Sequence, residues 1–159
     1  MAPATAAVIL AFAVTLHNIE EMIWLPGFRH PALPVLTPFQ FRFAATAVAV
    51  LFWLLAAGLA AGVPLAPVLT GFAAAMIVNA LVPHLALTLV LRRYHPGLAT
   101  GLLAVVPAAF LALSSLGGAV AIAESGVLAW RAGAAFVALG FSVPLLLWSG
   151  SKLERWRGT

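Results

Sequence analysis

Long apolar segments, separated by short polar or proline-containing breaks, dominate the chain. Five of them can be delimited, at residues 3–25, 38–61, 67–91, 96–123 and 127–148. Each is close to the ~20 residues that an α-helix needs to cross ~30 Å of hydrocarbon. The pattern therefore predicts an all-α fold, an integral membrane bundle of about five transmembrane helices that forms a single domain over residues 1–159.

The ends of these segments carry signals that stop or start helices. The first segment closes at Pro26-Gly27, and the second opens with Thr37-Pro38-Phe39-Gln40, the spacing of a capping box with proline in the first turn. Residues 1–16 contain no Lys or Arg, so we expect the first segment to be a retained span rather than a secretion signal.

The composition agrees with lipid as the main solvent. Hydrophobic residues make up 64% of the chain and charged residues 8%, against about 25% charged residues in a typical soluble domain. The absence of cysteine excludes disulfides and thiolate metal sites. The net charge is +4. In a membrane protein such an excess of basic residues reflects the topology of the loops rather than nucleic-acid binding. We therefore expect membrane lipid as a partner and no nucleic acid.

The basic residues are distributed unevenly over the loops of a five-span topology. One side holds Arg29, Arg42, Arg92, Arg93, Lys152, Arg155 and Arg157, and the other holds Arg131. Because basic loops stay in the cytoplasm, we expect the N-terminus outside and the C-terminus in the cytoplasm. The expected location is a bacterial plasma membrane.

Ionisable residues interrupt the first apolar segment. His17, Glu20 and Glu21 are spaced so that a helix carries them on one face. A carboxylate at such depth costs about 2.5 to 3.5 kcal/mol on insertion scales. These side chains therefore need protons, a cation, or partners on another helix.

The third apolar segment offers such partners. Asn79, Pro83 and His84 are its unusual interior residues. Pro83 has no amide hydrogen, so the carbonyl group of Asn79 loses its helical partner. His84 lies about 12 Å from the Arg92 end of the helix. In the five-span topology, this depth matches that of His17 and Glu21.

A short basic turn, Arg92-Arg93-Tyr94-His95-Pro96-Gly97, follows the third segment. We expect it to cover the polar cluster from the cytoplasmic side. Tyr94 can donate a hydrogen bond there, and His95 can bind a metal or relay protons.

These residues resemble the HXXEE family of multi-span membrane proteins. His17-Asn18-Ile19-Glu20-Glu21 fits its HXXEE motif, Tyr94-His95-Pro96-Gly97 fits its YXPG motif, and His84 is the better-placed candidate for its further histidine. The resemblance covers about residues 16–97. It implies a multi-span membrane fold and makes Tyr94 and His95 catalytic candidates, but it implies no particular reaction.

The leading interpretation is a metal-dependent enzyme. Two histidines and two carboxylates suit zinc, iron or manganese. The His-x-x-Glu-Glu spacing is similar to the helical His-x-x-Glu-His spacing of metalloproteases. In this interpretation His17, Glu21 and His84 bind the metal, and Glu20 acts as general base on a bound water.

The substrate in this interpretation is a lipophilic small molecule, because it has to reach a site within the bilayer. Asn79 and Arg93 are the residues that we expect to contact it. For Asn79, a hydrogen bond between helices is the alternative role, and for Arg93 it is contact with anionic lipid headgroups.

Three other functions stay open on sequence grounds. The cluster suits transport of a proton or a metal cation, for which a homo-oligomer would have to supply the alternating-access architecture. It also suits a non-catalytic subunit in which buried polar groups specify packing or bind a lipid headgroup. The third is a metal-free enzyme that uses Glu20 or Glu21 as an acid or base.

Overall fold

Helices make up all the regular structure of the part of the chain that the computed structural model describes, residues 1–28, 36–117 and 126–157. The helix α1 (Pro3–Trp24) is closed by a 3₁₀ turn, η1 (Leu25–Gly27). The other elements are α2 (Pro38–Ala60), α3 (Ala66–Asn79), η2 (Ala80–Ala86), α4 (Leu87–Leu91), α5 (Leu98–Thr100), η3 (Gly101–Val105), α6 (Val106–Ser115) and α8 (Gly126–Arg157).

Several of these elements join end to end. The π-helix η2 links α3 to α4, and the π-helix η3 links α5 to α6. Within the described residues, five helices are long and apolar enough to cross a membrane: Pro3–Gly27, Pro38–Ala60, Ala66–Leu91, Leu98–Ser115 and Gly133–Trp156. This confirms the predicted all-α fold with five membrane-spanning helices.

Two sequence predictions extend beyond what the structure describes. The last residues of the predicted span 96–123 and the cation Arg29 lie outside the described ranges. At the C-terminal end, α8 continues past Trp148, where the last predicted span stops, to Arg157.

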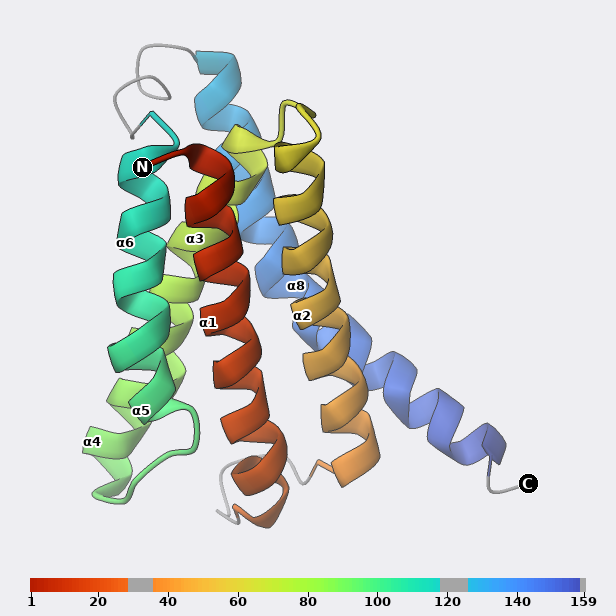
Figure 1. The fold of residues 1–159 in the computed structure, drawn as a ribbon. Helices are drawn as coiled ribbons and strands as arrows, with labels where there is room; N and C mark the ends of the chain where they lie inside the picture. The colour runs from red at the N-terminus through yellow and green to blue at the C-terminus, as the bar shows by residue number, and fades with distance from the viewer. Residues whose placement is uncertain (29–35, 118–125, 158–159) are drawn as a thin grey trace.

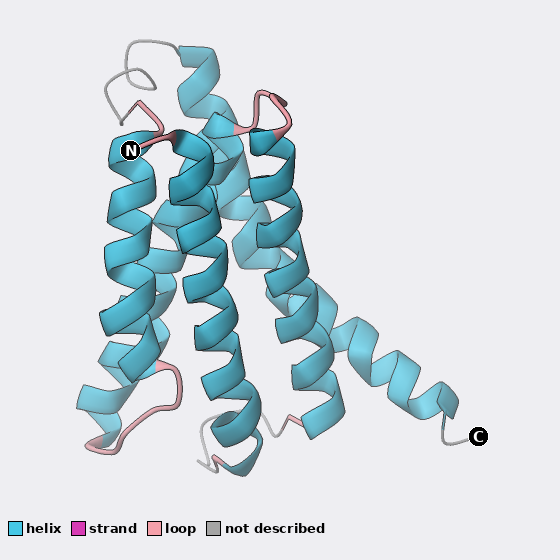
Figure 2. Ribbon diagram, in the orientation of Figure 1, coloured by secondary structure: helices cyan, strands magenta, loops and turns pink. Residues whose placement is uncertain are grey.

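The five long helices form a closed ring. α1 packs against α2 and α6, α2 against α8, α8 against α3, and α3 against α6. The loops lie at the two ends of this bundle (Figure 2). The N-terminus lies at one end, whereas the turn between α4 and α5 and the C-terminal end of α8 lie at the other (Figure 1).

Small side chains allow the helices to approach closely. The buried face of α1 carries four alanines, Ala6, Ala7, Ala11 and Ala13, beside Leu10 and Val14. Helices in lipid gain most of their packing energy from such close van der Waals contact. Larger rings fill the space further in, where Phe52 of α2 and Phe72 of α3 lie 5.8 Å apart.

The outer surface of the bundle is apolar over much of its height. Large side chains that are more than half exposed occur on every one of the five long helices, among them Phe12, Leu54, Val90, Leu103 and Phe141. A soluble protein of this size rarely exposes so much contiguous apolar surface. The exposed side chains are therefore those that lipid would cover.

The start of α2 is held by a capping box and by α8. Thr37 Oγ1 accepts a hydrogen bond from the Gln40 amide at 3.2 Å, and Gln40 Oε1 accepts one from the Thr37 amide at 3.2 Å, which confirms the predicted cap. The Thr37 hydroxyl also donates to Glu154 Oε2 at 2.7 Å. The same side chain thus starts one helix and binds another.

We predict that Thr37→Ala lowers the free energy of unfolding by about 1–2 kcal/mol, because it removes the cap and the bond to α8. Thr37→Ser keeps the hydroxyl and should remain close to the wild type. Unfolding by SDS in mixed micelles, followed by circular dichroism, measures both variants. Equal unfolding midpoints for the two variants would contradict the prediction.

Candidate metal centre

Three side chains from two helices meet inside the bundle. His17 and Glu21 are four residues apart on α1, and His84 comes from η2. One ligand atom of each residue lies within 4.8 Å of the other two. Both histidines are almost fully buried, at 1% and 2% exposure, and Glu21 is partly buried. The structure therefore brings together the three residues that the sequence analysis selected as metal ligands.

The position of His84 depends on the wider helix around Pro83. Proline cannot donate to the carbonyl group four residues earlier, and the chain adopts the π-helical pattern over Ala80–Ala86. On an α-helix, two side chains five residues apart would point about 140° away from each other. The wider turn brings Asn79 and His84 to one face, where Asn79 Nδ2 lies 3.3 Å from His84 Nε2.

The hydrogen-bond partner of His84 assigns its tautomer. Its Nδ1 lies 2.7 Å from the backbone oxygen of Pro96. Because a carbonyl oxygen only accepts, a neutral His84 ring that donates from Nδ1 to Pro96 keeps a lone pair on Nε2. That Nε2 lies 3.3 Å from Glu21 Oε1. A histidine that binds a metal is usually oriented in this way, by donating its other nitrogen to a carbonyl or a carboxylate.

The same reasoning applies to His17. Its Nδ1 lies 3.2 Å from Thr100 Oγ1. The single hydroxyl hydrogen of Thr100 goes to Glu20 Oε2 at 2.6 Å, so Thr100 has to accept from the histidine. Nδ1 of His17 is thus protonated, and the free lone pair on Nε2 faces Glu21 Oε2 at 3.8 Å.

Two imidazole lone pairs and one carboxylate therefore face a common space. In a tetrahedral site with bonds of about 2.1 Å, ligand atoms lie about 3.4 Å apart. The separations of 3.3 and 3.8 Å between Glu21 and the two histidines are close to that value. The three ligand atoms lie within 4.8 Å of one another, so the side chains would have to move closer together to bind a divalent cation.

Glu20 points away from this group and binds the turn after α4. It accepts hydrogen bonds from the Tyr94 hydroxyl, from the Gly97 amide at 2.8 Å, and from the amide and hydroxyl of Thr100 at 3.0 and 2.6 Å. Both carboxylate oxygens are used by these donors. The geometry does not place Glu20 as the expected general base beside a metal-bound water, and gives it instead the position of a clamp between α1 and the start of α5.

Gly97 allows the turn to approach both histidines. Its φ of +93° lies in the left-handed region that favours glycine. A Cβ atom at this position would lie 2.6 Å from His84 Cε1 and 2.9 Å from His17 Cε1, which is too close for any side chain. Glycine is therefore needed both for the backbone conformation and for the space.

Comparison with known proteins identifies the family of the chain. The family described as "Protein of unknown function with HXXEE motif" matches residues 8–112. The chain belongs to the HXXEE family. It is 40% identical over 103 residues to the uncharacterized protein YrkK of Bacillus subtilis (strain 168). That match covers 60% of this chain and 65% of YrkK, so the chain spans just under two thirds of the relative's length. No solved structure matches the chain.

The two motifs of the HXXEE family form one hydrogen-bonded unit in this protein. From the first motif, His17 and Glu21 face the common space while Glu20 binds the turn. From the second motif, the Tyr94 hydroxyl and the Gly97 amide donate to Glu20, and the Pro96 carbonyl accepts from His84. Residues far apart in sequence thus contact the same group of side chains.

His95 and Tyr94 lie in the turn outside the membrane-spanning segments. His95 is buried against Phe28, with ring centroids 4.9 Å apart, and its Nδ1 lies 3.1 Å from His84 Nδ1 and 3.0 Å from Pro96 O. Burial lowers the pKa of His95, so its ring is neutral near pH 7. Burial and the bond to Glu20 raise the pKa of Tyr94, so it stays a protonated donor.

The two residues predicted to contact a substrate lie in different places. Asn79 Nδ2 lies 3.4 Å from His17 Nε2 and 3.3 Å from His84 Nε2, directly at the ligand atoms. Arg93 stacks over the ring of Phe28 at 4.9 Å and lines a separate surface cavity with Tyr94. Asn79 therefore belongs to the centre, and Arg93 does not reach it.

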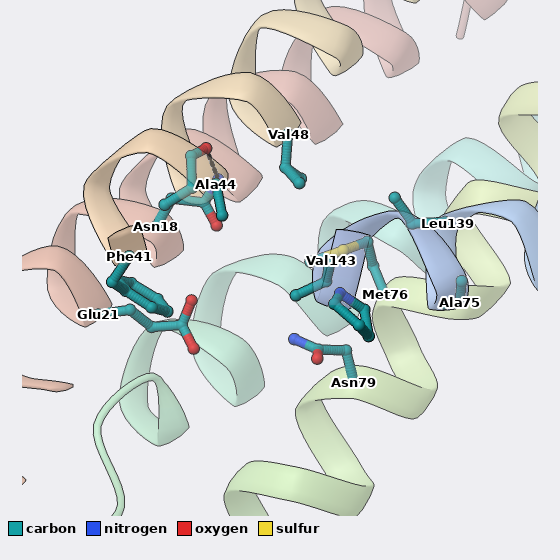
Figure 3. A pocket seen from close by; sticks show the side chains of 13 residues that line it. Asn18, Glu21, Phe41, Ala44, Val48, Ala75, Met76, Asn79, Leu139 and Val143 are labelled. Carbon is teal, nitrogen blue, oxygen red and sulfur yellow. Dashed lines mark hydrogen bonds between the residues drawn. The ribbon is translucent and has the colours of Figure 1, made fainter. Parts of the chain in front are cut away.

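An apolar cavity of about 350 Å³ adjoins the centre. Its walls come from α1, α2, α3 and α8, and Glu21 and Asn79 are among its few polar residues. In Figure 3 these two side chains face each other on one side of the cavity, and Val48 and Leu139 lie on the opposite side. Asn18 also lines it, but its amide donates to the Ala45 carbonyl at 2.8 Å and is not free to bind a ligand.

Sequence reasoning missed Thr100 and the acceptor role of Pro96. Thr100 lies in an apolar segment, where an isolated threonine carries no signal. The Pro96 carbonyl is a backbone group whose partner depends on the path of the turn. Gly97 is part of the predicted turn, but only the structure shows that its missing side chain makes room for the histidine rings.

We predict that Gly97→Ala displaces both imidazoles and weakens metal binding by at least about tenfold, because second-layer contacts set ligand orientation. The matched control is Gly62→Ala. Gly62 has a similar φ of +83°, but an added Cβ would meet no atom within 4 Å. Gly97→Ala and Gly62→Ala both place alanine at a positive φ, but only Gly97→Ala brings a Cβ atom against the histidine rings. Isothermal titration with Zn²⁺ compares them, and equal losses would refute a steric role for Gly97.

Proposed function

We propose that this protein is a metal-dependent membrane enzyme that acts on a lipophilic substrate at the His17–Glu21–His84 centre. One observation carries the proposal: two histidines whose Nδ1 atoms are held by acceptors turn their Nε2 lone pairs towards one carboxylate, next to an apolar cavity. Asn79 Nδ2 lies 3.4 and 3.3 Å from the two Nε2 atoms, and a metal ion at the centre would replace this amide as their shared partner.

The donor set suits several divalent metals. Two histidines and one glutamate hold zinc in many hydrolases, and two histidines with one carboxylate hold Fe²⁺ in non-haem oxygenases. Mn²⁺ accepts the same nitrogen and oxygen ligands. Three protein ligands leave coordination positions for water and substrate, which is the property of a catalytic rather than a structural site.

The metal, when bound, would activate a water molecule or polarise a substrate oxygen. The chain's own residues have distinct roles. Asn79 lies where a polar group of the substrate would meet the centre, and the apolar walls of the cavity would hold the remainder. Glu20 is a positioning residue, because it acts on His17 through Thr100 and on His84 through the turn that carries Pro96.

The proposal includes an orientation in the membrane, with the N-terminus outside and the C-terminus in the cytoplasm. The turn between α4 and α5 and the end of α8 lie at the end of the bundle opposite the N-terminus (Figure 1). These segments carry Arg92, Arg93, Lys152 and Arg155. Because basic residues favour the cytoplasmic side, the metal centre would lie in the cytoplasmic half of the bilayer.

We predict that purified wild-type protein dialysed against Zn²⁺, Mn²⁺ or Fe²⁺ retains about one ion per chain of at least one of these metals. His17→Ala and Glu21→Gln should each lose most of it, because each removes one of three ligands. Retention should also decline in acid, since protons compete for both histidines. Mass spectrometry of the elements measures the metal content of each protein.

Glu154→Gln is the control, because Glu154 binds Thr37 and none of the three candidate ligands, and it should keep the wild-type metal content. The alternative is a polar clasp that only joins α1 to η2. In that case no metal is retained by the wild type, and Glu21→Gln lowers only the stability. This result would overturn the proposal.

The positioning role of Glu20 makes a separate prediction. Glu20→Gln and Thr100→Val should each weaken metal binding by about 10- to 100-fold, the usual effect of losing a contact behind a ligand, while saturating metal restores one ion per chain. A general base would behave differently, since its loss would leave the Kd for metal unchanged. Isothermal titration with Zn²⁺ separates the two roles.

A further inference from the structure

Four small residues are among those that line the apolar cavity beside the metal centre. Ala44 and Ala45 come from α2, Ala75 from α3, and Gly140 from α8. Small residues in membrane helices commonly serve close helix contact. These four instead border a space of about 350 Å³, at the low end of the ~300–1,000 Å³ that small-molecule sites occupy.

Two glycines of α8 distinguish close packing from open space. An added Cβ at Gly150 would lie 3.1 Å from the Cα of Gln40, so Gly150 is needed where α8 crosses α2. An added Cβ at Gly140 would meet no atom within 4 Å. Gly140 is an exposed residue that lines the open side of the cavity, so no neighbour requires a glycine there.

The polar groups of the cavity are concentrated at the metal centre. Glu21 and Asn79 provide them, and the Asn18 amide is used by the backbone of α2. In Figure 3 the side opposite Glu21 carries Val48 and Leu139, and Gly140 follows Leu139 on α8. A molecule that fits this lining has one polar end and one hydrocarbon part.

We propose that the cavity takes a single hydrocarbon chain of an amphiphilic substrate, whose polar end lies at Glu21 and Asn79, and that Gly140 provides the room for this chain. The occupant is a chain from the surrounding lipid phase, since the five apolar helices place the cavity within it. A polar solute finds partners only at the Glu21 and Asn79 end, so the remaining lining favours a hydrocarbon chain. The inference rests on the proposed metal centre and specifies its substrate class.

Binding of alkyl hydroxamates tests this inference without a known reaction. The hydroxamate group binds divalent metals, and its alkyl part can be varied from acetohydroxamate through hexanohydroxamate to decanohydroxamate. The protein is loaded with Co²⁺, whose visible absorption changes when its ligands change. Comparing variants with the wild type at one detergent concentration cancels the partitioning of the ligand into micelles.

We expect Gly140→Leu to bind acetohydroxamate like the wild type and to bind decanohydroxamate at least about tenfold more weakly, since side chains forced into filled space are costly. Gly140→Ala and Gly140→Val should give graded losses. The matched control is Gly133→Leu, also on α8, where an added Cβ meets no atom within 4 Å and no cavity residue is changed. It should bind all three ligands like the wild type.

The outcomes separate this inference from the proposed function. Two outcomes would overturn the chain-binding role while leaving the metal centre in place. In one, Gly140→Leu weakens the binding of all three hydroxamates equally. In the other, Gly133→Leu weakens the binding of decanohydroxamate as much as Gly140→Leu does. Failure of Co²⁺ to bind, or of acetohydroxamate to change its spectrum, would overturn the metal centre and the inference with it.

Discussion

The structure depends on the hydrogen bonding of one carboxylate, that of Glu20. A carboxylate at the edge of an apolar bundle is best accommodated when donors surround it. The partly buried Glu20 obtains four donors, from the turn after α4 and from Thr100 at the end of α5. These bonds hold that segment against α1. As a result the Pro96 carbonyl reaches His84 and the Thr100 hydroxyl reaches His17. Satisfying one charge thus orients two imidazoles.

The ring of helices explains why the candidate site lies where it does. α1 and α3 are not neighbours in the ring, since α2, α8 and α6 lie between them on its two sides. The polar group of His17, Glu21 and His84 joins these two helices across the interior, and the apolar cavity adjoins it. A molecule in the cavity would therefore lie directly beside this polar group.

The polar network is also complete as it stands. Among the described residues, no buried side-chain nitrogen or oxygen lacks a partner. Asn79 contributes to this balance because its amide nitrogen lies at both free lone pairs. A metal ion has to replace these two hydrogen bonds, which are long and therefore weak.

Sequence alone determined the architecture, the family and the three ligand candidates. The apolar segments, the His17–Glu21 spacing and the Pro83–His84 pair are local patterns, and local patterns fix helix length and helix faces. The tertiary structure decided what the two glutamates do. Adjacent residues on one helix looked equivalent, yet Glu20 binds the turn and Glu21 faces the histidines. That division depends on the path of a turn seventy-odd residues away, together with backbone groups of Pro96 and Gly97 that no side-chain pattern records.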